Sequence, residues 1–418
     1  MKIENHSGIV SVDSSGIRQG SYLVLTCFFF AHATFHFMSQ SFSVMLPAVK
    51  TSFGITPIQV GAIVTAHELA AGLSSLPGGI LSDYLRRHRA LLMAVCMIVF
   101  GLGWLLISFA PFYGFVLVGM VILAMASSVW HLPSLAELGL QFSNHRGAAL
   151  AIHGAGGSMG DIFGPVLTGL LLGIISWRSI LSMYFIVPLI MAIWIYWVFI
   201  ILEKTQNKTP ETVAKKKTDF KEQLTITKDI LKRTHIWRVN FVAGFRGMCF
   251  SVLVTFLPLF MKEQLGFSSK SIGFHFGLLW VIGIVASPLM GHLSDRWGRK
   301  QVLVPALLYS CLLIILMAFF GKGALFTLWI VLLGFSIRSD YSLVSATILD
   351  IAGNQVATTI LGVLSLTRYL MGAVSPLIAG ALYQYSGMRA TLLFVAVLFA
   401  CSAIVFSTVD MSKKAEKS

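Results

Sequence analysis

The chain has 418 residues, of which 56% are hydrophobic and 11% are charged, and its formal net charge is +14. Because a soluble domain carries about 25% charged residues, this composition excludes a soluble multidomain protein. Apolar runs of the roughly 20 residues needed to cross a bilayer recur along nearly the whole chain. The expected fold is therefore an all-α integral membrane protein.

Twelve such runs predict twelve transmembrane helices. The expected spans are 21–47, 56–82, 90–109, 112–139, 147–174, 176–201, 236–262, 270–293, 300–320, 324–349, 357–386 and 388–408. The longest polar break carries nine Lys or Arg and five Asp or Glu. The resulting division is an N-terminal tail (1–20), a six-helix bundle (21–201), a linker (202–235), a second six-helix bundle (236–408) and a C-terminal tail (409–418).

The basic residues predict how the helices are oriented. With both termini in the cytosol, 21 Lys and Arg fall in cytosolic segments and six fall in outer loops and span ends. Cytoplasmic loops are enriched in these residues. Both terminal tails and the linker are therefore expected in the cytosol. Residues 1–20 lack an apolar segment, so no cleavable signal peptide is expected. The predicted location is a plasma membrane or bacterial inner membrane, and no nucleic-acid partner is expected.

An internal repeat links the two halves. Gly54 and Gly266 lie 212 positions apart, and the segment from Gly79 to Asp83 recurs at the same offset from Gly291 to Asp295. Other pairs lie 211 or 212 apart: Pro47 and Pro258, Gly61 and Gly273, Pro165 and Pro376, Gly169 and Gly380, Arg178 and Arg389. Two halves of the same orientation predict a pseudo-two-fold axis along the membrane normal and a central cavity at the seam between the bundles.

The break after the eighth expected span has a recognisable loop sequence, Gly-His-Leu-Ser-Asp-Arg-Trp-Gly-Arg-Lys, from Gly291 to Lys300. It resembles the signature Gly-x-Leu-Ala/Ser-Asp-Arg-x-Gly-Arg-Lys/Arg of the major facilitator superfamily, and the likeness in span number, linker and repeat covers the whole chain. The resemblance implies two six-helix bundles that transport a solute by alternating access. Gly291 and Gly298 permit close helix approach and a tight turn.

Charged residues in this loop predict a gate. Asp295 can pair with Arg296 or Arg299, and such a pair could hold one access state and break in the other; a static charge cluster is the alternative. The first-half copy keeps Gly79 and Asp83, but Tyr84 and Arg86 replace the usual arginine and second glycine, and Arg87 follows. The two loops are therefore not expected to act equally.

The fifth expected span carries a glycine motif that contains Gly160, Asp161, Gly164 and Pro165. It resembles the Gly-x-x-x-Gly-Pro-x-x-Gly-Gly motif of antiporter-type exporters in this superfamily, with Thr168 in place of one glycine. The resemblance favours export over import, whereas close helix packing is the structural alternative. The fourth span, 112–139, has no Lys or Arg, unlike many proton-coupled drug exporters of the family.

Ionisable residues at membrane depth are the candidate substrate and ion ligands, because a charge there costs about 2.5–3.5 kcal/mol unless it faces water or a partner. In the first half, Glu68 lies on a polar face of the second span and is the leading candidate for a proton carrier. Asp161 is the second. His32 and His36 share a face of the first span, and His131 lies deep in the fourth. We expect these groups to face a common aqueous pocket.

The second half is cationic at membrane depth. Arg246, Arg338 and Arg368 stand against Asp340 as the clear mid-span acid. Three guanidiniums suit an anionic or zwitterionic substrate; alternatively, they pair across the seam with Glu68 and Asp161.

These features predict a secondary active transporter of a small organic solute, with proton-coupled antiport and efflux as the preferred mode. An uptake symporter or uniporter of the same fold is the alternative, and a non-transporting sensor or scaffold is a distant one. Neither a phosphate loop nor a catalytic set is visible, so no enzyme activity, cofactor or metal site is expected, and an ion gradient supplies the energy. The expected partners are the lipid bilayer and a small-molecule substrate, and the protein is expected to work as a monomer.

Overall fold

The computed structural model describes residues 20–85, 88–142, 145–206, 228–337, 339–352 and 357–411. Every secondary-structure element within these ranges is a helix. The first half contains α1 (Ser21–Phe53), α2 (Pro57–Tyr84), α3 (Arg89–Ser108), α4 (Tyr113–Gln141), α5 (Arg146–Leu171), α6 (Trp177–Tyr184) and α7 (Ile186–Gln206). The second half contains α9 (Thr234–Glu263), α10 (Ser269–Trp297), α11 (Arg299–Phe320), α12 (Gly323–Ile337), α13 (Ser339–Ala352) and α14 (Ala357–Ser407).

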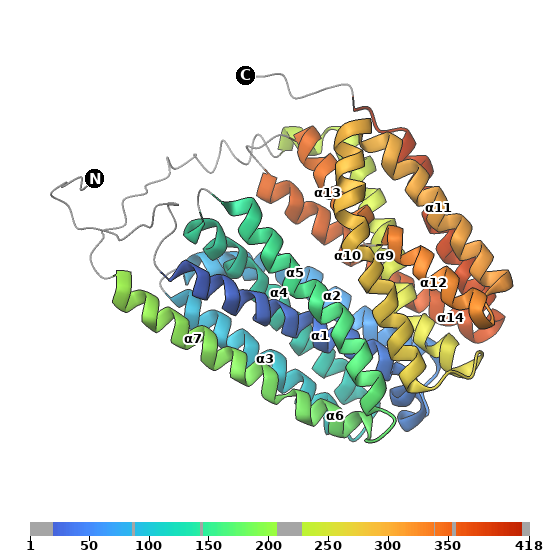
Figure 1. Ribbon diagram of the computed structural model, residues 1–418, viewed down its shortest axis with the longest axis horizontal. Helices are drawn as coiled ribbons and strands as arrows, with labels where there is room; N and C mark the ends of the chain where they lie inside the picture. Colours follow the sequence, from blue (N-terminus) through green and yellow to red (C-terminus); the bar gives the residue numbers. More distant parts are fainter. Residues whose placement is uncertain are drawn as a thin grey trace.

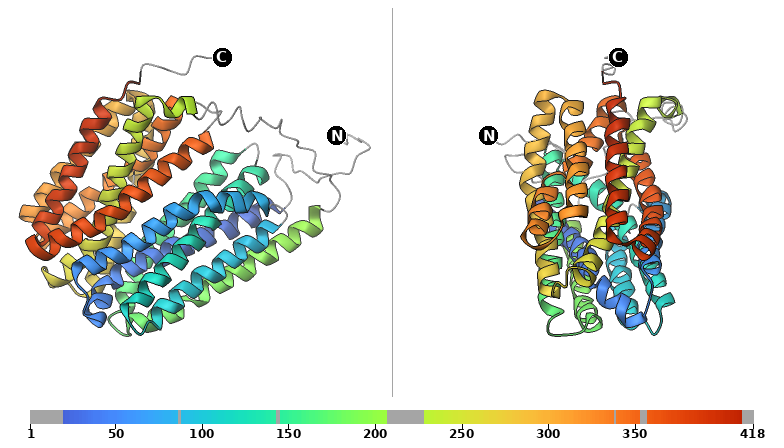
Figure 2. Two further views of the ribbon diagram at one scale, coloured as in Figure 1. Left: turned by 180° about the vertical axis from the view of Figure 1, so that it is seen from behind. Right: turned by 90° about the vertical axis from the view of Figure 1, so that its right-hand side faces the viewer.

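The helices form two bundles that lie side by side. Figure 1 shows α1–α7, in blue to green, as one bundle and α9–α14, in yellow-green to red, as the other, and the left view of Figure 2 shows the same two bodies from behind. Within the first bundle α1 packs mainly on α5, and within the second α9 packs mainly on α14. The expected residue limits of tails, bundles and linker stay a prediction.

Nine helical segments in the described part of the chain are long and apolar enough to cross a bilayer. α2 and α5 are not among them, although their 28 and 26 residues are long enough to cross. α2 carries the polar face and α5 the glycine motif noted in the sequence. α14 has 51 residues and changes direction at Gly387, where φ is +76°. The total of twelve transmembrane spans stays a prediction.

The first expected span ends later in the structure than at residue 47. α1 continues through Pro47 to Phe53 and stops where Gly54 adopts φ +60°. Proline inside a membrane helix is tolerated because neighbouring groups satisfy the freed carbonyl, so the helix extends beyond Pro47. α2 then starts with Pro57 at its first position and a capping box between Thr56 and Gln59.

The bundles meet at one end, which we call the closed end; it carries the α1–α2 and α9–α10 turns. A Cβ on Gly61 of α2 would overlap the carbonyl oxygen of Pro376 in α14, and a Cβ on Gly273 of α10 would overlap that of Pro165 in α5. Gly61 and Gly273 are repeat partners, as are the two prolines, so the α2–α14 and α5–α10 contacts are related by the internal symmetry.

At the other end, which we call the open end, the matching glycines have no neighbour from the opposite bundle. Nothing lies within 4 Å of a Cβ built on Gly154, Gly291 or Gly362, and one on Gly79 meets Leu132 of its own bundle. The close helix approach expected at Gly291 is therefore wrong for this conformation, because the bundles diverge toward this end.

Candidate functional site

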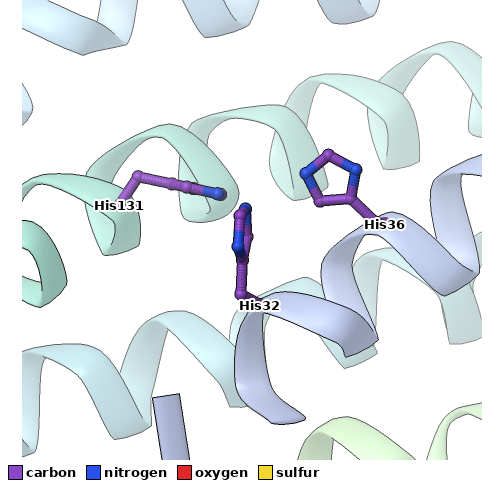
Figure 3. Close-up of side chains that lie close together, drawn as sticks. All are labelled: His32, His36 and His131. Atoms are coloured by element: carbon purple, nitrogen blue, oxygen red, sulfur yellow. The ribbon is translucent and has the colours of Figure 1, made fainter. Parts of the chain in front are cut away.

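Four histidines and an aspartate gather where α1, α4 and α5 meet. α1 contributes His32 and His36, α4 contributes His131, and α5 contributes His153 and Asp161. The His32 ring lies 4.7 Å from His36 and 5.1 Å from His131, measured between centroids, and it stacks on His153 at 4.2 Å with an interplanar angle of 7°. Figure 3 shows His32 between the other two labelled rings. We call these five residues the histidine cluster.

The glycines of α5 make room for this cluster. A Cβ on Gly156, Gly160 or Gly164 would overlap a backbone carbonyl oxygen of α1. On Gly157 it would lie 2.9 Å from Cε1 of His32 and 3.1 Å from Cδ2 of His36. Because successive turns of α5 lack side chains on this face, α1 approaches closely and its imidazoles lie over the α5 backbone. The glycine motif thus has a packing role.

Hydrogen bonds fix the three rings at the centre of the cluster. Nδ1 of His36 lies 2.8 Å from Oδ1 of Asp161, Nδ1 of His32 lies 2.8 Å from the carbonyl oxygen of His153, and Nδ1 of His131 lies 2.7 Å from that of Ser127. Each partner is an oxygen that accepts, so Nδ1 carries the proton and Nε2 keeps its lone pair in each neutral ring. Asp161 is 3% exposed, whereas the His36 side chain is 37% exposed.

Glu68 lies at the seam between the bundles. Its Oε2 is 3.3 Å from the position of a Cβ on Gly372 of α14, and its Oε1 is 3.7 Å from Nδ1 of His67. One turn along α2, Thr65 donates a hydrogen bond to the carbonyl oxygen of Ala373 at 2.6 Å. The carboxylate of Glu68 is therefore largely buried against the opposite bundle.

Arg368 belongs to the same stretch of α14. It precedes Gly372 by one turn, its guanidinium lies 4.3 Å above the ring of Tyr369, and Tyr369 packs where Gly72 of α2 leaves space. The Cγ atom of Arg368 lies 2.7 Å from the position of a Cβ on Gly247 of α9, so its stem packs within the second bundle, one turn from the α14 residue that Glu68 approaches.

Arg246 does not lie at the seam, in contrast to the expected common pocket. Its Nη2 is 3.0 Å from Oδ2 of Asp340 and donates to the carbonyl oxygen of Ile337, and its guanidinium lies over the ring of Phe399. Arg246 is 5% exposed and Asp340 is fully buried. The pair lies inside the second bundle, where each buried charge would be costly without its opposite partner. Arg338 lies outside the described residues.

The loop signature contains an ion-pair network. Arg299 contacts Asp295 through Nη1, Ser294 through the same nitrogen, and Asp350 of α13 through Nε at 2.9 Å. Gly298 adopts φ +101° between α10 and α11, which fits the expected tight turn. Of the two partners expected for Asp295, the structure pairs it with Arg299, while Arg296 is exposed.

In the first-half copy of the loop, Arg87 and the side chain of Asp83 lie outside the described residues. Arg89 lies 3.6 Å from Glu137 of α4, and Glu137 accepts a hydrogen bond from Gln141. Glu137 thus joins α3 and α4 near the open end.

A cavity of about 570 Å³ lies in the second bundle, between α10, α11 and α12, and its lining is largely apolar. It contains none of the predicted site residues.

The structure therefore brings His32, His36, His131 and Asp161 together and places Glu68 at the seam, with Arg368 one turn from the α14 residue that Glu68 approaches. It separates Arg246 and Asp340 from both groups. Sequence reasoning missed Asp350 as a partner of the loop and His153 as part of the cluster. One ring nitrogen from each of His32, His36 and His131 lies within 4.8 Å of the others, and the expectation of no metal site stays a prediction. Only the spacing of His32 and His36 signalled this cluster.

These features define a multi-pass membrane transporter built from two related helical bundles. The family model of the Major Facilitator Superfamily matches residues 28–376 and 284–418, and the chain belongs to that family.

Characterised relatives and solved structures agree with this assignment. The chain is 22% identical to the hexuronate transporter of Bacillus subtilis (strain 168), over 87% of this chain and 89% of that protein. It is 24% identical to the glycerol-3-phosphate transporter of the same organism, over 82% of each. The fold is similar to the crystal structure of a bacterial homolog of the human lysosomal transporter Spinster, in an inward-facing and unoccupied conformation, with a TM-score of 0.77, 14% identity and coverage of 94% and 97%. The chain is thus a transporter of small solutes.

Proposed function

We propose that the protein is a proton-coupled secondary transporter that moves a small anionic organic solute by alternating access, with Glu68 as the proton carrier. The observation that carries this proposal is the position of Glu68, whose carboxylate is buried at the α2–α14 contact. Alternating access requires that contact to open, so the surroundings of Glu68 change between the two access states. A change of surroundings changes proton affinity, which couples proton movement to the conformational cycle.

The charge pattern at the seam supports an anionic solute. Arg368 lies one turn from Gly372, the residue of α14 that the Glu68 carboxylate approaches. Protonation of Glu68 removes a negative charge from this region and leaves the positive charge of Arg368 to attract an anion. Proton and solute then bind together, which favours symport. The relatives named for hexuronate and glycerol-3-phosphate carry solutes with a carboxylate or a phosphate.

Export by proton antiport remains the second candidate. It rests on the glycine motif of α5, for which packing against α1 gives a structural role. In both cases the proposed orientation has cytosolic termini in a plasma membrane or bacterial inner membrane, so the open end faces the cytosol and this conformation is inward-facing.

Proteoliposomes with an imposed pH gradient test the proposal. We expect glucuronate or glycerol-3-phosphate to move in the direction of the proton gradient, with little flux of glucose. Glu68→Gln is expected to remove the stimulation by the gradient while flux down a solute gradient persists, because glutamine keeps the shape and loses the titratable proton. The matched control is His275→Gln in α10, whose ring is bonded within its own bundle to Ser271 and Thr327.

Three outcomes distinguish the alternatives. Flux that is insensitive to the pH gradient in the unmodified protein rejects proton coupling. Solute movement against the direction of the protons replaces symport with antiport. Equal flux of glucose and the two anions rejects the anionic substrate class.

A further inference from the structure

Three histidines of the cluster come from two helices that lie far apart in the sequence. Among the residues that the structure describes, His32, His36 and His131 are the one group of three potential ligand side chains whose donor atoms all lie within 4.8 Å of one another. The rings converge around His32, as Figure 3 shows. Imidazole nitrogens are ligands for zinc and neighbouring first-row transition metals.

The surroundings of these rings match those of metal ligands. In metal sites a coordinating histidine almost always donates its other ring N–H to a carboxylate or a backbone carbonyl, which fixes the tautomer and the ring orientation. His36 makes this bond to the buried carboxylate of Asp161, and His32 and His131 make it to carbonyl oxygens. All three rings thus offer Nε2, the nitrogen that a metal would take.

We propose that His32, His36 and His131 form a binding site for a divalent first-row transition metal ion, with Zn²⁺ as the representative ion. The three Nε2 atoms are the ligands, and Asp161 and the carbonyl groups of Ser127 and His153 are the outer shell. Zinc–nitrogen bonds are about 2.0–2.1 Å long, so the rings close in by roughly 1 Å through small side-chain rotations. Three protein ligands leave a fourth position for water or an anionic group.

Two further features fit this site. The His36 side chain is 37% exposed, so an ion can reach the cluster from the surface of the bundle. Gly157 lies directly beneath the rings, where a Cβ would be 2.9 Å from Cε1 of His32, so α5 leaves the space that the ligands occupy. His153 stacks on His32 but is not part of the group of three, and its side chain is 3% exposed.

Metal binding to the purified full-length chain in detergent tests the site. We expect one Zn²⁺ per chain by elemental analysis after desalting, and one Co²⁺ with the visible absorption of a tetrahedral nitrogen-ligated ion. His36→Ala and His131→Ala are expected to abolish both signals. Asp161→Asn is expected to weaken Zn²⁺ binding by about 10- to 100-fold, the usual effect of losing an outer-shell carboxylate.

The matched control is His275→Ala, which removes a histidine of the second bundle that is bonded to Ser271 and Thr327. It is expected to bind one ion as the unmodified chain does. Size-exclusion chromatography and helical circular dichroism confirm folding in each case. Less than one ion per chain in the unmodified protein overturns the proposal, and so does equal binding by His131→Ala and His275→Ala. Because Glu68 is not a ligand, this result is independent of the flux measurements on Glu68→Gln.

Discussion

At the residue scale, the buried charges of this protein differ in what surrounds them. Arg246 and Asp340 face each other inside the second bundle, whereas Glu68 lies at a surface that must open during transport. The sequence predicted that each of these charges needs water or a partner, because an isolated charge in hydrocarbon is costly. It could not predict which of the two each had, since that depends on which helix packs opposite.

Arg246→Ala tests the structural role of the buried pair. Removal of one partner leaves the other charge buried alone, which typically costs about 3–5 kcal/mol. We expect a clearly lower unfolding temperature, measured by tryptophan fluorescence in detergent.

The double variant Arg246→Met with Asp340→Leu is the control. It removes both charges and fills the space, so it is expected to recover most of the stability and to retain solute flux in proteoliposomes. A stable double variant without flux would show that the pair contributes to transport directly.

At the element scale, the packing of α5 on α1 decides where the histidine cluster lies. Gly156, Gly160 and Gly164 bring the two backbones together, and Gly157 accommodates the imidazoles. The repeat of small residues was visible in the sequence and was compatible with export or with packing. The structure gives α1 as the packing partner, which the sequence could not identify because a glycine face is complementary to almost any helix.

Gly164→Ala tests this contact. The new Cβ would overlap the carbonyl oxygen of Phe37, so α1 and α5 have to separate, and overpacking of this kind costs about 1–3 kcal/mol. We expect a lower unfolding temperature. The matched control is Gly154→Ala on the same helix, where the Cβ meets nothing within 4 Å and alanine favours the helix. Equal unfolding temperatures for the two variants would contradict the role of the contact.

The loop after α10 gives a second test at this scale. Gly298 adopts φ +101° and ψ 149°, a backbone region that is essentially restricted to glycine and costs about 1–3 kcal/mol for other residues. Gly298→Ala is therefore expected to lower the unfolding temperature in the same fluorescence assay. Gly291→Ala, in the adjacent helix and with open space around the new Cβ, is expected to leave it unchanged or raised. The opposite order would contradict the geometry of the turn.

At the scale of the whole molecule, contacts between the bundles are concentrated at the closed end. Besides the glycine contacts, Lys50 of α1 forms an ion pair across the bundles with Glu263 of α9 at 2.6 Å, and Glu263 accepts a hydrogen bond from Tyr383 of its own bundle. These groups join the two bundles, so they stabilise this conformation relative to any in which the closed end separates.

Lys50→Ala is expected to shift the conformational equilibrium slightly. The pair is partly exposed, at 22% and 31% for its side chains, and such pairs contribute about 0–1 kcal/mol, which changes a population ratio by up to roughly fivefold. Spin labels at positions 154 and 362, where the structure has open space, report the separation of the bundles. We expect a larger fraction of short distances in Lys50→Ala. The exposed Lys262 provides the control, and identical distance distributions in Lys50→Ala and Lys262→Ala would contradict the role of the ion pair.

The sequence by itself determined the membrane class, the two related halves, the loop signature and the candidate polar residues, because hydrophobic length, repeat offset and helical spacing are local properties of the chain. His32 and His36 could be assigned to one face for the same reason. Only the tertiary structure decided that His131 and Asp161 join them, that Arg246 turns inward to Asp340, and that Glu68 meets α14. Those partners come from helices distant in the sequence, and their positions depend on how glycine faces and buried charges are matched when the bundles pack.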